Sequence, residues 1–271
     1  MRQTKAGIAH PFYGVTPSRG LHELRNTWVQ RTYLAEQCEA LIRELPSAIQ
    51  ATNSDAPCRS ERGKTFRIHA PSNGVRAEND AMHESSKERR LERRIYEAYQ
   101  PSRGDTANAL WHQLVAFQVP LAERQQSRGW GKIDLLALTA DGHPIIVELK
   151  TDESTETPLR AILEGMANAV AVAKNWSYLS REILASLSAH GRSAVVASGL
   201  VIPRTLVLAP DQYWKRWEEG GAEARREVTP ESRAAVRALR RAAANQQFPV
   251  DLGVLTETSD KISLRRAEVD W

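Results

Sequence analysis

Apolar residues recur at helical spacing along much of the chain. The first such pattern covers residues 21–45, and Pro46, which lacks a backbone N–H, is expected to end that helix. Thr157 and Pro158 are residue types typical of a helix N-cap and first helical position, so a helix is predicted to start there and to continue to about Tyr178. Further helices are predicted over residues 87–99, 212–218 and 230–245.

Short apolar runs lie between these helices and predict strands. From about residue 85 the predicted order is helix, three strands, helix, strand, helix and then strands. Because helices and strands alternate, we expect an α/β fold with a central mixed sheet flanked by helices. The strands are expected at residues 111–121, 133–138, 144–150, 204–209, 249–256 and 261–266.

The first 80 residues differ from the rest of the chain. Residues 1–20 carry Pro, Gly and Ser without periodicity, and residues 46–80 are rich in Ser, Asn, Pro and charged side chains. Residues 65–69 form a short strand candidate in this region. We therefore predict a mainly helical and irregular N-terminal extension (1–80), followed by the α/β domain (81–271). The pattern of the extension indicates no function.

The composition is that of an ordinary globular protein, with 41% hydrophobic and 26% charged residues. The longest apolar stretches are too short or too interrupted to span a bilayer, and the N-terminus lacks the apolar segment of a secretory signal. Two cysteines, Cys38 and Cys58, are too few for a disulfide framework or a zinc site. These features favour a cytoplasmic protein with reduced thiols and no membrane contact.

The net charge of +4 and the pI near 9.2 are mildly basic. Basic residues comprise 29 Arg and 8 Lys. Since the guanidinium group contacts phosphates in pairs of hydrogen bonds, the excess of arginine is compatible with a nucleic-acid partner. A genome whose base composition favours arginine codons would explain the same excess.

Three charged side chains at the ends of two apolar runs are the most informative residues. Asp134 opens the first run, and Glu148 and Lys150 close the second. Since side chains alternate along a strand, Glu148 and Lys150 must project from the same face. The two runs are joined through Asp141-Gly142, a pair typical of hairpin turns.

The register of this hairpin decides whether Asp134 faces the other two charges. A two-residue turn would direct Asp134 to the opposite face of the sheet. One more loop residue, with Gly142 in the left-handed conformation, would pair Ala140 with Pro144 and Asp134 with Lys150. The three charged side chains would then share a face.

Two carboxylates and an ammonium on one sheet face can hold a divalent cation beside a phosphate. Mg²⁺ bound by Asp134, Glu148 and the backbone carbonyl of Leu149 would acidify a water and neutralise charge on the phosphate, and Mn²⁺ could replace it. Lys150 would orient the water or stabilise the transition state, and it should stay protonated beside two carboxylates. The alternative is a solvated Glu148–Lys150 pair at a strand end and a capping aspartate.

The segments Gly-Lys-Ile-Asp134 and Val-Glu148-Leu-Lys150 resemble the motif of the PD-(D/E)XK nuclease superfamily, which has the restriction-endonuclease-like fold. The element order over roughly residues 85–210 is also similar. The resemblance implies a core of helix, three strands, helix and strand, in which Asp134 and Glu148 bind Mg²⁺ and Lys150 assists the attacking water. Asp134 follows an isoleucine rather than the proline of the motif.

The resemblance also implies further site residues. Superfamily members often add an acidic residue from the first helix, for which Glu92 or Glu88 is the match, although pairing with nearby arginines would explain both. Many place an arginine or glutamine on the helix after the lysine strand. Arg160 matches this position, and an ion pair with Glu164 is the alternative. Gln118, on the preceding strand, either lines the same cleft as a substrate contact or is an exposed strand glutamine.

These residues predict a Mg²⁺-dependent endo- or exonuclease with a nucleic-acid partner, DNA in preference to RNA. One alternative is a catalytically inactive nucleic-acid-binding module of the same fold. Another is a scaffold protein with no nucleic-acid role. Nucleases of this fold often dimerise, so a homodimer is also an open expectation. The sequence indicates neither the cleavage pattern nor a preferred target.

Overall fold

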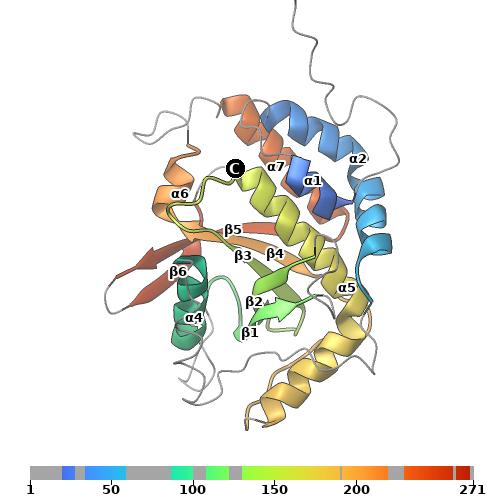
Figure 1. Cartoon of the computed structure of the whole chain (residues 1–271), viewed down its shortest axis with the longest axis vertical. Helices are drawn as coiled ribbons and strands as arrows, with labels where there is room; N and C mark the ends of the chain where they lie inside the picture. Colours follow the sequence, from blue (N-terminus) through green and yellow to red (C-terminus); the bar gives the residue numbers. More distant parts are fainter. Residues whose placement is uncertain are drawn as a thin grey trace, which may run out of the picture.

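The computed structural model describes residues 20–27, 34–58, 87–99, 108–121, 130–189, 191–218, 229–258 and 261–268. Over these ranges the chain is an α/β protein, built on an open six-stranded mixed sheet with helices on both faces (Figure 1). The α/β fold with a central mixed sheet, predicted from the apolar pattern, is confirmed. No helix within these ranges is both long and apolar enough to cross a membrane.

The sheet consists of β1 (Gln113–Pro120), β2 (Lys132–Leu138), β3 (Pro144–Leu149), β4 (Arg204–Pro210), β5 (Val250–Glu257) and β6 (Ile262–Arg266). The strands lie side by side in chain order. Strands β3, β4 and β5 are mutually parallel, and the other neighbours are antiparallel. The carboxyl ends of the three parallel strands therefore lie at the same end of the sheet. All residues of β3 are buried, as expected for a central strand covered on both faces.

The long helix α5 (Pro158–Ala189) connects β3 to β4 and packs across one face of the sheet. Thr157 caps it, because its hydroxyl oxygen accepts a hydrogen bond of 3.1 Å from the backbone N–H of Arg160. The predicted cap and start of this helix are confirmed, but its predicted end near Tyr178 is wrong. Apolar residues continue to be buried beyond that point, which extends the packed face: Leu179, Ile183 and Leu187.

The same side of the sheet carries further helices: α1 (Leu21–Thr27), α2 (Leu34–Asp55), α6 (Asp211–Lys215) and α7 (Pro230–Asn245). Their apolar side chains share one buried cluster with α5, β4 and β5. Leu41 of α2, Leu163 of α5 and Val236 of α7 are fully buried within it. The N-terminal helices therefore belong to the same hydrophobic core as the sheet.

Pro46 does not end the first long helix, as the sequence predicts, but lies inside α2. The residues around it, Leu45 and Ala48, are almost fully buried against α5 and α7. This packing compensates for the missing backbone hydrogen bond of the proline. The end of α2 is held by Lys174, whose ammonium donates to the backbone carbonyls of Asn53 and Ala56 at 2.7 and 2.6 Å.

Residues 46–55 are thus helical, although the sequence predicts a linker there. The remainder of that predicted linker, with the strand candidate at 65–69, lies largely outside the described residues. The boundary near residue 80 lies outside them as well and stays a prediction.

The opposite face of the sheet is covered by α4 (Lys87–Tyr99). Its apolar residues Leu91, Ile95 and Tyr96 are buried against side chains of β1 to β4 that point to this face. The first turns of α4 carry Glu88 and Glu92, which reach the end of β3. Helices α4 and α5, which cover opposite faces, thus bring acidic residues to the same end of the sheet.

Candidate metal centre

The β2–β3 hairpin directs Asp134 and Glu148 to the same place. Leu138 pairs with Pro144 and Leu135 with Val147, so one more step of this register sets Asp134 opposite Glu148. The two carboxylates therefore project from the same face of the sheet. The hairpin thus brings together Asp134 and Glu148, the two carboxylates that the sequence predicts as metal ligands.

The turn of this hairpin has the predicted three residues, but it begins one residue earlier than predicted. Thr139 and His143 close it, with a backbone hydrogen bond of 2.9 Å, and Gly142 at φ +80° occupies its last position. The predicted pairing of Asp134 with Lys150 is therefore wrong. The partner moves by two residues, to Glu148, and a shift of two leaves every side chain on its face.

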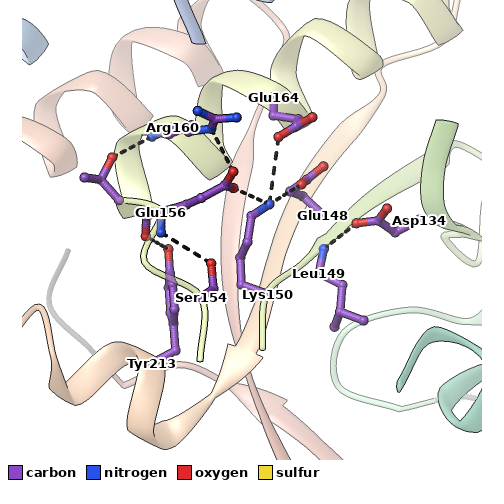
Figure 2. Close-up of polar contacts among 10 residues, drawn as sticks. Asp134, Glu148, Leu149, Lys150, Ser154, Glu156, Arg160, Glu164 and Tyr213 are labelled. Atoms are coloured by element: carbon purple, nitrogen blue, oxygen red, sulfur yellow. Dashed lines mark hydrogen bonds and ion pairs between the residues drawn. The ribbon is translucent and has the colours of Figure 1, made fainter. Parts of the chain in front are cut away.

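Three carboxylates converge at this point. Asp134 is half-buried, and its Oδ2 accepts a hydrogen bond of 2.9 Å from the backbone N–H of Leu149, which fixes its orientation (Figure 2). Glu148 is buried, and Glu88 reaches in from α4. Oxygen atoms of Glu88, Asp134 and Glu148 all lie within 4.8 Å of one another. Carboxylate oxygens at such spacing suit a hard divalent cation such as Mg²⁺ or Mn²⁺.

The same environment makes these carboxylates difficult to ionise. Burial raises the pKa of Asp134 well above its ordinary value, and the charges of Glu92 and Glu88 raise it further. Burial likewise raises the pKa of Glu148, against the opposing effect of Lys150. Burial also raises the pKa of Glu88. A cluster of this kind gains most from a bound cation, which replaces the protons.

Lys150 lies at the centre of a second set of carboxylates. Its ammonium is 2.7 Å from Glu148, 2.7 Å from Glu156 and 3.8 Å from Glu164 (Figure 2). Burial by itself would lower the pKa of Lys150, but Glu148, Glu156, Glu164 and Asp134 together raise it well above its ordinary value. Lys150 is therefore a fixed cation, as the sequence predicts.

Glu156 was not identified from the sequence. It lies in the loop between β3 and α5, where no periodic pattern marks it. The one available signal was Lys150 itself, because an ammonium in a nearly continuous apolar strand requires carboxylate partners. Glu156 also holds Arg160, whose Nε lies 3.0 Å from its Oε1 (Figure 2). The ion pair shown for Arg160 is thus with Glu156, four residues earlier, whereas the sequence offers Glu164, four residues later, as its partner. The predicted contact of Arg160 with substrate stays a prediction.

Gln118 and Glu92 form a separate pair at the edge of the site. The side-chain amide of Gln118 donates to Oε2 of Glu92 at 2.5 Å, and Glu92 is 2% exposed. Burial raises the pKa of Glu92 to about 8. Of the two acidic candidates on α4, Glu88 rather than Glu92 belongs to the group of three within 4.8 Å. The predicted metal contact of the Leu149 carbonyl and the substrate contact of Gln118 stay predictions.

Comparison of the chain with protein-family models, with curated proteins and with solved structures finds no match. The function must therefore be inferred from the residues of the chain itself.

Proposed function

We propose that the chain is a Mg²⁺-dependent nuclease that hydrolyses phosphodiester bonds of DNA or RNA, within the PD-(D/E)XK superfamily that its motif resembles. The observation that carries the proposal is the convergence of Glu88, Asp134 and Glu148 within 4.8 Å, with Lys150 paired to Glu148. The order of α4, β1 to β3, α5 and β4 supports the superfamily assignment, because it repeats the helix, three strands, helix and strand of that core.

A purely structural ion-pair cluster explains the site less well. At an effective dielectric constant of about 20, two ionised carboxylates whose oxygens lie within 4.8 Å repel each other by about 3 kcal/mol or more. Lys150 pairs with Glu148, and it also serves Glu156 and Glu164. A structural cluster would match each buried charge with a partner. The close approach of Glu88, Asp134 and Glu148 favours a divalent cation as their common partner.

The residues of the site have separate roles in this proposal. Mg²⁺, when bound by Glu88, Asp134 and Glu148, would acidify a water and neutralise charge on the scissile phosphate. The Leu149 N–H keeps the Asp134 carboxylate oriented toward the cluster. Lys150 stays protonated, so it stabilises the extra negative charge of the transition state rather than acting as a base. The water oxygen forms the new bond to phosphorus, and the ester oxygen leaves with the electron pair and takes up a proton.

The experiment is cleavage of plasmid, single-stranded DNA and RNA by the purified full-length chain. We expect nicking with Mg²⁺ or Mn²⁺ that stops in EDTA. Glu148→Gln should lower the rate by about a hundredfold or more, since it removes charge from a buried ligand with little change of shape. Glu97→Gln is the matched control, because Glu97 is exposed on α4, away from the cluster. Equal cleavage by Glu148→Gln and the control would overturn the assignment.

One observation favours the inactive nucleic-acid-binding module as a second candidate. Three carboxylates surround Lys150, and its pairing with Glu148 competes with metal binding. If that pairing persists in the presence of Mg²⁺, the protein would bind nucleic acid without cutting it. Salt-sensitive binding of DNA together with no nicking at any Mg²⁺ or Mn²⁺ concentration would support this candidate.

A further inference from the structure

The Glu156 carboxylate bridges two cationic side chains beside the carboxylate cluster. Its Oε2 lies 2.7 Å from the ammonium of Lys150, and its Oε1 lies 3.0 Å from Nε of Arg160 (Figure 2). Lysine and arginine bind the oxygens of a phosphate through charge-assisted contacts of the same kind. Glu156 thus occupies a position in which a phosphate would make the same two contacts.

This position adjoins the proposed metal site. The ammonium of Lys150 lies 2.7 Å from Glu148 as well, so a single side chain links the Glu156 carboxylate to a proposed metal ligand. In the proposed mechanism Lys150 stabilises the negative charge that develops on the phosphate, which requires direct contact between the two. Glu156 and the substrate therefore compete for the same ammonium.

Exchange of the Glu156 carboxylate for a phosphodiester leaves the local charge unchanged. Each carries one negative charge, so the total charge around Lys150 and Arg160 stays the same. Loss of Glu156 without a replacement would leave an almost fully buried ammonium with one partner fewer. The carboxylate therefore compensates the two cations when no ligand is bound, and a ligand of equal charge is suited to replace it.

Of the carboxylates around Lys150, Glu156 is the one best placed to leave. Its side chain is 30% exposed, which gives the carboxylate a path to solvent, whereas Glu148 is buried. Glu164 lies farther from the ammonium, at 3.8 Å, and is part of α5. Release of Glu156 alone therefore frees one position on Lys150 and one on Arg160 together.

The backbone of Glu156 does not have to move for this release. The hydroxyl of Tyr213 donates a hydrogen bond of 3.1 Å to the carbonyl of Glu156. The N–H of Glu156 donates to Oγ of Ser154 at 3.4 Å. Rotation of the side chain about this held backbone is sufficient to carry the carboxylate away from both cations.

We infer that Lys150 and Arg160 form a subsite for one phosphate of the substrate, and that Glu156 closes this subsite until a phosphodiester displaces it. The inference rests on the proposed function for the identity of the ligand. Glu156 is then an internal competitor that lowers the affinity of the chain for nucleic acid. If the subsite is closed in about nine molecules out of ten, the apparent affinity is about tenfold below that of the open subsite.

The test measures binding of labelled DNA and RNA oligonucleotides to the full-length chain by fluorescence anisotropy, in EDTA, which prevents metal-dependent cleavage. Glu156→Gln removes the charge and keeps the shape of the side chain. We expect it to bind the preferred oligonucleotide about tenfold more tightly than the wild type. In cleavage with Mg²⁺, the effect should appear in KM rather than in kcat. Glu153→Gln is the matched control, because Glu153 lies on the same loop but pairs with Lys87.

Arg160→Gln separates the subsite from a general gain of positive charge. It should weaken binding, and E156Q/R160Q should lose most of the gain of Glu156→Gln, because only one cation is left to release. A gain of the same size in both backgrounds would overturn the inference. So would equal binding by Glu156→Gln and Glu153→Gln. Weaker binding by Glu156→Gln would show instead that the carboxylate orients Lys150 for the ligand.

These outcomes are distinct from those of the nuclease proposal. Tighter binding by Glu156→Gln with no cleavage by any variant would retain the subsite and reject the nuclease. Nicking by the wild type with equal KM for Glu156→Gln and Glu153→Gln would reject the closed subsite and leave the nuclease proposal intact. Absence of oligonucleotide binding in every variant would overturn the subsite as well.

Discussion

The ammonium of Lys150, the residue directly after β3, lies 2.7 Å from Oε1 of Glu148, two residues earlier in the chain. The period of two in a strand places both side chains on one face, and burial of both makes their pairing strong. A carboxylate that is expected to bind a metal ion is thus already neutralised by its own neighbour. In the proposed nuclease the metal and the lysine must share Glu148.

Lys150→Met tests this shared role. We expect cleavage to fall by about a hundredfold or more, because the fixed cation near the transition state is lost. Mn²⁺ should bind at least as tightly as before, because the ammonium no longer competes for Glu148. Calorimetric titration and initial cleavage rates measure the two effects. Lys261→Met, at an exposed turn position, is the control. Loss of metal affinity in Lys150→Met would show that the lysine supports the site instead.

Glu88 and Glu92 are expected to differ as metal ligands. Glu88 has an oxygen within the three-carboxylate group, whereas Glu92 is held by the Gln118 amide. Glu88→Gln should therefore weaken Mn²⁺ binding by about tenfold or more, and Glu92→Gln should weaken it less. Calorimetric titration of both variants under the same conditions makes the comparison. The reverse order would assign Glu92 as the ligand from α4.

The metal-free protein should lose stability as pH rises from about 4.5 to 8. Glu92 has a folded-state pKa of about 8 against an ordinary value of 4.5, so over this range the folded protein keeps a proton that the unfolded chain has released. The raised pKa values of Asp134 and Glu148 act in the same direction. Lys150 titrates above this range. Thermal unfolding in EDTA should show a falling Tm, and Mg²⁺ should raise Tm more at pH 8 than at pH 5.

The control for this pH dependence is Glu92→Gln, which removes one of the titrating groups. Its Tm should depend less on pH between 4.5 and 8 than that of the wild type. A wild-type Tm that rises with pH in EDTA would contradict the expected protonation of the cluster.

The sequence predicts most of the fold because periodicity is a local property. Alternation along β2 and β3 leaves two hairpin registers open, and the one with a three-residue loop, which sets Asp134 on the face of Glu148, is the one observed. The predicted pairing is wrong by two residues, because the register depends on which position of the turn Gly142 occupies, and here it is the last rather than the middle one. The sequence wrongly ends the helix at Pro46, because the burial of Leu45 and Ala48 that stabilises α2 around this proline is a tertiary effect. Glu156 reaches Lys150 only through the path of a loop, which has no pattern.

The backbone of Gln118 is strained, with φ at +52°, and the side-chain amide of this residue donates a hydrogen bond to Glu92. Glycine adopts this φ without strain, and alanine does not. Gln118→Gly and Gln118→Ala both remove the amide, so we expect the alanine variant to be less stable by about 1 kcal/mol. Urea unfolding of the two variants measures this difference. Equal stability would show that the positive φ is not under strain.

Gly165 of α5 permits the helix to lie close against the sheet beneath Glu148. A Cβ at this position would lie 2.4 Å from Cγ2 of Thr205 on β4 and 3.6 Å from Cβ of Glu148. Thr205 is fully buried, so Gly165→Ala should destabilise the protein by about 1–3 kcal/mol through overpacking. Thr205→Ser removes the methyl group that the new Cβ would meet and keeps the hydroxyl. The double variant G165A/T205S should therefore be more stable than the two single effects predict, by about 1 kcal/mol or more in urea unfolding. If the effects of the two substitutions on the free energy of unfolding simply add, the helix shifts away from the sheet instead. The cleavage rate of G165A should then fall, because α5 no longer packs closely against Glu148.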